Sequence, residues 1–218
     1  MIKTILTSTW TKAVVFALCL LPLAILIGRG FHGGLGANPI EFITHTTGDW
    51  TLRFLVLTLA ITPLRKILHQ PQLIRFRRML GLFAFFYVCL HFSTWIGLDK
   101  FFDWTEMWKD VEKRRFITVG FAGFTLLIPL AITSTAGWIR RLGGKRWQLL
   151  HRLVYLTAIL GVIHYYWLVK SDVTKPIEYA WVFGILLAWR AGDWLYTRWK
   201  RPAPRTVRNA PPPSAETA

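Results

Sequence analysis

The stretch RFRRMLGLFAFFYVCLHFSTWIG, residues 75–97, decides the fold of this chain. It begins in a cluster of arginines and continues with a run, 79–97, that carries no formally charged side chain. A helix of that length spans roughly 29 Å, close to the thickness of the hydrocarbon core of a bilayer. The stretch therefore predicts a membrane-spanning helix. His91 lies within it, and an ionisable side chain at such depth indicates a functional site.

Similar apolar segments recur along the whole chain, which has 218 residues and is 53% hydrophobic. Several of its 12 tryptophans lie near the ends of these segments, as in the aromatic belts of membrane proteins. We predict an all-α integral membrane protein with six transmembrane helices, at about 13–28, 50–64, 79–97, 116–133, 147–169 and 177–195. These helices form one domain, 1–199, and the Pro- and Ala-rich segment 200–218 is predicted to be a disordered cytoplasmic tail.

The net charge of +16 reflects membrane topology rather than nucleic-acid binding. Most basic residues lie in four short segments, 3–12, 65–78, 140–146 and 198–208, that alternate with the outward loops. The positive-inside rule places these segments in the cytoplasm, and both termini with them. The outward segment 99–115 has mixed charge and contains Trp104 and Trp108. It is predicted to be either a short amphipathic helix at the membrane surface or a docking surface.

Two of the six histidines are predicted to lie at a similar depth in the membrane. His91 follows Arg78 by 13 residues, or about 20 Å of helix, and His164 follows Arg146 by 18 residues, or about 27 Å. The third and fifth spans run in the same direction, so both side chains lie in the outer half of the bilayer. His32, His45 and His69 are predicted to be loop residues without a role.

Two imidazoles that meet from neighbouring helices suit the iron of a haem. With both axial positions filled, the haem would carry electrons rather than bind a gas. The chain contains no CxxCH motif, so such a haem would be non-covalent and b-type. The alternative is that one or both histidines are buried, hydrogen-bonded structural residues. Cys19 and Cys89, each inside an apolar segment, are predicted to be small buried hydrophobes and not a disulfide.

His151 lies only about 8 Å from the cytoplasmic edge, and its role is left open between two interpretations. It is either an interfacial residue or part of a second site for haem, flavin or quinone, with Arg77, Arg78 and Arg152 nearby. Helical phase argues against a shared face, because His151 and His164 are separated by about 220° around an ideal helix. The three arginines are predicted to set the orientation of the chain in the membrane. The alternative is that they bind a propionate or a phosphate.

Three motifs carry a resemblance to a known family: RRMLGL…YVCLH, KRWQLLHRLVYL and GVIHYYW. With them, nearly the whole chain apart from its tail resembles the MsrQ (formerly YedZ) family, haem-binding membrane subunits of periplasmic methionine sulfoxide reductase systems. That family lies within the wider ferric-reductase-like transmembrane family. The resemblance implies a b-type haem, an associated FMN and a place in the bacterial inner membrane, with His91, His151 and His164 as candidate ligands.

The resemblance also implies a direction of electron flow. Electrons would come from membrane quinol or a cytoplasmic flavin reductase and pass to MsrP, a periplasmic molybdenum-cofactor enzyme that reduces methionine sulfoxide in oxidised proteins. The chain would thus be an electron-transfer subunit rather than the catalytic one. Two rival functions remain: a self-contained ferric or quinone reductase, and a transporter that uses the histidines as proton relays.

Overall fold

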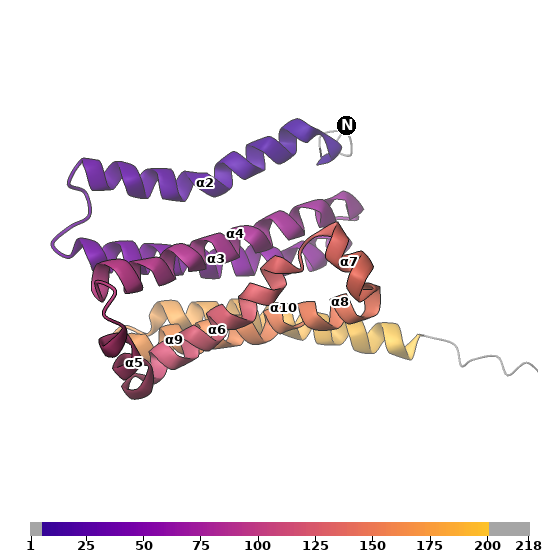
Figure 1. Ribbon diagram of the computed structural model, residues 1–218. Helices are drawn as coiled ribbons and strands as arrows, with labels where there is room; N and C mark the ends of the chain where they lie inside the picture. Colours follow the sequence, from indigo (N-terminus) through magenta and orange to yellow (C-terminus); the bar gives the residue numbers. More distant parts are fainter. Residues whose placement is uncertain (1–5, 201–218) are drawn as a thin grey trace, which may run out of the picture.

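The computed structural model describes residues 6–200, and the regular structure of that part is entirely helical (Figure 1). The longer helices are α2 (Thr9–Phe31), α3 (Pro39–Ile67), α4 (Ile74–Thr94), α6 (Arg115–Ile132), α9 (Leu153–Leu168) and α10 (Thr174–Trp199). Shorter elements are a 3₁₀ turn (Pro71–Leu73), a π-helix (Trp95–Asp99), α5 (Trp104–Lys113), α7 (Ala136–Leu142) and α8 (Gly144–His151). The longer helices run up and down as a bundle (Figure 1).

Four helical segments are long and apolar enough to cross a membrane: Thr9–Phe31, Pro71–Asp99, Arg115–Ile132 and Gly144–Leu168. They contain four of the six predicted spans. The other two predicted spans lie in α3 and α10, which are as long, with 29 and 26 residues, but carry charged side chains. By composition the chain is thus a helical membrane protein, with four candidate spans among residues 6–200.

Several charged side chains of α3 and α10 have ion-pair or hydrogen-bond partners. Asp49 of α3 forms an ion pair with Arg53 at 2.6 Å and accepts a hydrogen bond from the hydroxyl of Tyr179 in α10. Arg190 of α10 donates to the Tyr155 hydroxyl at 2.9 Å and to the Leu59 carbonyl at 2.7 Å. Lys66 bonds to Asp193 between the same two helices. These bonds also tie α10 to α3 and α9.

The prediction for the second span was wrong at its beginning. We expected a loop over 31–49, but α3 begins at Pro39 and includes His45 as well as the predicted segment 50–64. The Asn38 side chain accepts a hydrogen bond from the Glu41 N–H, and Pro39 fits the first turn, where no N–H is needed. This cap starts the helix three turns before the apolar run.

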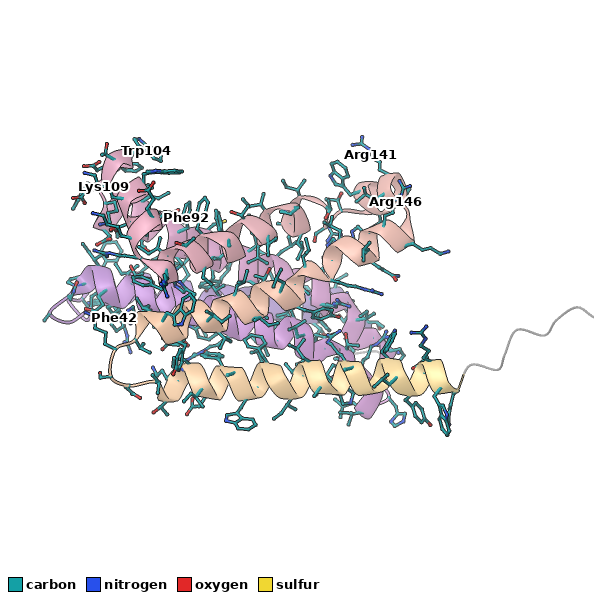
Figure 2. All side chains as sticks on the ribbon, turned by 90° about the horizontal axis from the view of Figure 1, so that it is seen from below. Phe42, Phe92, Trp104, Lys109, Arg141 and Arg146 are labelled. Carbon is teal, nitrogen blue, oxygen red and sulfur yellow. The ribbon has the colours of Figure 1, made fainter. Side chains whose placement is uncertain are left out.

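The two ends of the bundle differ in character. Figure 2 shows Trp104 and Lys109 at one end and Arg141 and Arg146 at the other. We call them the α5 end and the α7 end. The first turn of α2 and the last turn of α10 both lie at the α7 end (Figure 1). The predicted amphipathic helix in 99–115 is confirmed as α5, whereas the predicted tail lies outside the described residues from 201 onward.

Candidate functional site

A cavity of about 510 Å³ lies between α3, α4, α6 and α9, toward the α5 end. Both His91 of α4 and His164 of α9 line it. Its walls are largely apolar and aromatic, with Leu55, Val88, Phe92, Phe121, Phe124 and Leu127 among the lining residues. A mostly apolar cavity with a few converging polar groups is typical of a cofactor site.

The His91 and His164 rings meet inside this cavity. Their centres lie 6.0 Å apart, and their planes are inclined at 85°. Two imidazoles that share a metal have ring centres about 6 Å apart, since each nitrogen lies about 2 Å from the metal and roughly 1 Å from its ring centre. The spacing of the two rings therefore matches a bound metal between them.

Each ring is held from behind by a backbone carbonyl of another helix. Nδ1 of His91 lies 2.9 Å from the carbonyl oxygen of Thr44 in α3, and Nδ1 of His164 lies 2.7 Å from that of Phe116 in α6. A carbonyl only accepts, so Nδ1 carries the proton in both rings and Nε2 keeps its lone pair. Metal-binding histidines are commonly oriented in this way.

Two glycines make room for the rings. A Cβ at Gly48 of α3 would lie 3.1 Å from the His91 ring, and a Cβ at Gly120 of α6 would lie 2.6 Å from Nδ1 of His164. The second distance is shorter than any non-bonded contact that a side chain tolerates. The absence of a Cβ at these positions lets each imidazole approach the helix that holds it.

Comparison with known proteins places the chain in a family. The family model described as "Ferric reductase like transmembrane component" matches residues 47–162. This match includes His91 and ends two residues before His164. A relative from Herminiimonas arsenicoxydans, named "Protein-methionine-sulfoxide reductase heme-binding subunit MsrQ", is 59% identical over 82% of this chain and 83% of its own length. The chain belongs to the MsrQ family.

Other MsrQ proteins agree over still more of the chain. A relative from Caulobacter vibrioides with the same name is 54% identical over 86% of this chain and 90% of its own length. One from Xanthomonas euvesicatoria is 46% identical over 99% of both chains. No solved structure matches the chain.

The residues of the cavity fit the haem that the MsrQ name implies. The centres of the two imidazole rings lie 6.0 Å apart, a spacing that suits a shared metal, and aromatic side chains such as Phe92 and Phe124 provide apolar surface for a porphyrin. Trp95 also lines the cavity, and its indole N–H is buried without a hydrogen-bond partner among the described residues. A buried donor of this kind is expected to meet a ligand.

His151 lies apart from the cavity, near the α7 end. Its ring stacks on Trp147 with centres 3.9 Å apart, its Nδ1 lies 3.1 Å from the Trp147 carbonyl, and its Nε2 lies 3.4 Å from the Ser134 hydroxyl. Both ring nitrogens thus have protein partners. Of the arginines named with it, Arg77 is half-buried, whereas Arg78 and Arg152 are exposed.

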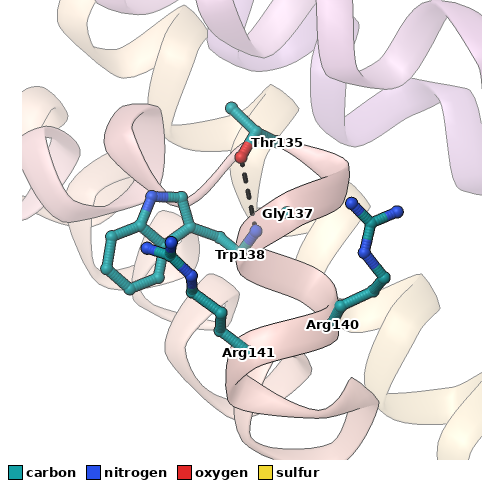
Figure 3. A pocket seen from close by; sticks show the side chains of 5 residues that line it. All are labelled: Thr135, Gly137, Trp138, Arg140 and Arg141. Atoms are coloured by element: carbon teal, nitrogen blue, oxygen red, sulfur yellow. Dashed lines mark hydrogen bonds between the residues drawn. The ribbon is translucent and has the colours of Figure 1, made fainter.

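A shallower hollow of about 480 Å³ lies at the α7 end, around Thr135, Gly137, Trp138, Arg140 and Arg141 (Figure 3). The Thr135 hydroxyl caps α7 by accepting from the Trp138 N–H at 3.4 Å. The Arg141 guanidinium lies 5.4 Å from the centre of the Trp138 ring. Its basic side chains suit the membrane surface, and it shares no lining residue with the histidine cavity.

Sequence reasoning missed several residues of the cavity. Gly48 and His45 fell in the supposed loop, yet both line it from α3. Gly120 stood within an apolar run, and its position near His164 depends on how α6 packs against α9. The Asn-Pro pair at 38–39, with Glu41 in the first turn, was a usable signal for an early start of α3.

Proposed function

We propose that the chain is a membrane b-type cytochrome of a methionine sulfoxide reductase system, with His91 and His164 as the axial ligands of its haem. The observation that carries this proposal is the pair of rings at 6.0 Å, each fixed through Nδ1 by a backbone carbonyl. The names of the relatives, heme-binding subunits of protein-methionine-sulfoxide reductase, support a haem in this family.

The role of the protein is electron transfer rather than catalysis on a substrate. When bound, the haem supplies a one-electron iron couple. His91 and His164 would both hold the iron, which would leave no place for oxygen. The carbonyls of Thr44 and Phe116 accept hydrogen bonds from the Nδ1–H groups, which would increase the electron density on the ligating nitrogens and stabilise the oxidised iron.

The proposed topology has six spans with the α7 end in the cytoplasm. The internal pairing of Asp49, Arg53, Arg190 and Asp193 reduces the cost of placing α3 and α10 in the membrane, and this supports counting them as spans. One domain, 1–199, then holds the haem in the bacterial inner membrane, with both termini and the tail in the cytoplasm.

The proposed electron path runs from the cytoplasmic side or the quinone pool to a periplasmic acceptor. The donor is membrane quinol or a cytoplasmic flavin reductase, and the acceptor is MsrP, the molybdenum-cofactor enzyme that reduces methionine sulfoxide in oxidised proteins. FMN, implied by the resemblance, is proposed as a second cofactor. The region of His151, Arg77, Arg78 and Arg152 remains the candidate place for a second haem, flavin or quinone.

Haem analysis of the purified full-length protein tests the ligands. We expect the wild type to bind haem with a six-coordinate, low-spin spectrum, and His91→Ala and His164→Ala each to lose the reduced-haem absorption band. His45→Ala is a matched control, because His45 lines the same cavity but is not one of the two paired rings. Full haem content in both histidine variants would refute the assignment.

The same preparation separates the rival functions. Reduction of ferric iron or quinone by the purified protein with no partner protein would favour a self-contained reductase. A colourless protein that binds no added haem would favour a proton-coupled transporter.

A further inference from the structure

Trp95 is the next residue along the chain after His91 and Phe92 that lines the cavity. It opens the π-helix 95–99 that follows α4 and lies four residues after His91, so the two side chains share one face. Both line the cavity, and the Trp95 Nε1 atom is buried without a hydrogen-bond partner. An unpartnered buried N–H costs about 1–3 kcal/mol, so it indicates an acceptor that the protein itself does not supply.

Arg114 is a second hydrogen-bond donor that lines the cavity, close in sequence to the residue that holds His164. It is the residue before α6 and lies two positions before Phe116, whose carbonyl holds His164. Among the described residues that line the cavity, Arg114 is the only lysine or arginine. Its Nε lies 3.1 Å from Asp110 Oδ1, and Asp110 is shared with Lys100 at 2.8 Å. The guanidinium therefore has donors left for another acceptor.

The acidic residues at this mouth of the cavity do not use these donors. Asp49 is paired with Arg53 and Tyr179, and Glu41 accepts from the Asn38 amide at 2.9 Å. Asp99 lies 3.9 Å from Lys100. None of these three carboxylates bonds to Trp95 or Arg114.

We propose that Trp95 and Arg114 bind the carboxylates of the haem side chains at the α5 end of the cavity. This inference rests on the proposed haem site and adds its orientation. Trp95 lies four residues after His91, and Arg114 lies two residues before Phe116, whose carbonyl holds His164. The carboxylate-bearing edge of the porphyrin then points to the α5 end, which is the face toward the periplasmic acceptor in the proposed topology.

Haem transfer to excess apomyoglobin measures the contribution of these two residues. In the full-length protein, Trp95→Phe and Arg114→Gln should each release haem roughly tenfold faster than wild type or more, as expected for a lost hydrogen bond to a charged group. Arg114→Lys should recover part of the loss. The low-spin spectrum should persist in all three, because both histidines remain.

Matched controls are Trp108→Phe and Arg115→Gln, exposed neighbours that do not line the cavity. The decisive comparison uses protein reconstituted with haem dimethyl ester, whose side chains carry no charge. With the ester, wild type and both variants should release the cofactor at one rate. Variants that release ordinary haem no faster than the controls, or that keep their difference with the ester, would overturn the inference. Absence of haem from the wild type would instead overturn the haem site itself.

Discussion

At the scale of single residues, the positions of the two histidine rings depend on two glycines that have no Cβ atom. Gly120 and Gly48 allow His164 and His91 to reach the carbonyls of Phe116 and Thr44 across a helix interface. Neither glycine has a positive φ, so an alanine is compatible with the backbone at both positions. The size of the side chain is therefore the property under constraint.

Gly120→Ala is expected to abolish haem binding or reduce it severely. Its Cβ would lie 2.6 Å from Nδ1 of His164, so the ring must leave the Phe116 carbonyl and change its tilt. Gly48→Ala should have a smaller effect, because its contact with His91 is 3.1 Å. The measurement is haem per protein after purification.

Gly123→Ala is the control on the same helix. Its Cβ would meet Leu160 at 3.6 Å, an ordinary contact, and alanine favours helix by up to about 1 kcal/mol over glycine. Haem content that falls equally in the Gly120 and Gly123 variants would contradict the steric argument.

At the scale of elements, Tyr87 of α4 forms hydrogen bonds with the backbone of α2 beside a proline. Pro22 lies inside α2 and has no N–H to donate. The buried Tyr87 hydroxyl accepts from the Leu23 N–H at 3.1 Å and donates to the Cys19 carbonyl at 3.0 Å, so it stands between two groups that would otherwise pair. Within a membrane such backbone groups have no water to bind.

Tyr87→Phe should weaken the contact of α2 with α4 by about 1–3 kcal/mol, because it removes the two hydrogen bonds that join the helices at this point. Cys19, buried at 5% exposure, reports the change. In a Cys89→Ser background, its reaction with a membrane-permeant maleimide should accelerate roughly 5- to 150-fold, as such an energy implies. Tyr166→Phe, at an exposed site, should leave the rate unchanged. Equal rates in all three proteins would show that the hydroxyl bridge does not hold α2.

The helix α5 is fixed to the end of α4 by one ion-pair cluster. Lys100 Nζ lies 2.8 Å from Asp110 and 3.6 Å from Glu106, and the Lys100 side chain is 10% exposed. The hydrogen bond to Asp110 raises the pKa of Lys100 above its ordinary value. The protonated form is therefore stabilised by folding of this corner.

Alkaline pH should release α5. Because the folded pKa is raised, the stabilisation is complete below the unfolded value, about 10.4, and is lost as the pH rises through the folded value. A fluorescent probe at Glu112→Cys, in a protein without Cys19 and Cys89, should report the release above that pH. Lys100→Met should show the released signal already at pH 7, whereas Lys109→Met, exposed on the same helix, should behave as wild type. A signal unaffected by Lys100→Met would mean that the cluster does not hold α5.

At the scale of the whole molecule, the two ends of the bundle differ in charge, and this difference bears on the orientation of the chain in the membrane. Basic loops gather at the α7 end, and the first turn of α2 and the last turn of α10 lie there too (Figure 1). The cavity with the two histidines lies nearer the other end. An acceptor that docks at the α5 end would meet the cofactor through a shorter thickness of protein.

Fusions to alkaline phosphatase, which is active only outside the cytoplasm, test this orientation. Fusions after Leu35, in the α2–α3 loop, and after Ser171, in the α9–α10 loop, should be active. Fusions after Gly143, between α7 and α8, and after Lys200 should be inactive. An active fusion after Lys200 would contradict six spans with cytoplasmic termini.

The sequence by itself determined the class of the protein. Apolar runs about as long as a bilayer core is thick, with basic segments between them, predict a membrane protein. The six predicted spans fall on the long helices, except that α3 begins earlier, at Pro39, and that the fifth span, 147–169, is divided between α8 and α9. Counting residues from the basic edges also placed His91 and His164 at comparable depth. These properties depend on local composition and on the fixed rise of a helix.

Tertiary structure alone decided how the two rings are held. Their partners, the carbonyls of Thr44 and Phe116, lie 47 and 48 residues away in the chain, on helices whose rotation no local pattern specifies. The roles of Gly120, Trp95 and Arg114 follow from that rotation as well. The depth of a helix in the membrane depends on its own residues. The face that it presents to a neighbouring helix depends on close packing between segments far apart in sequence.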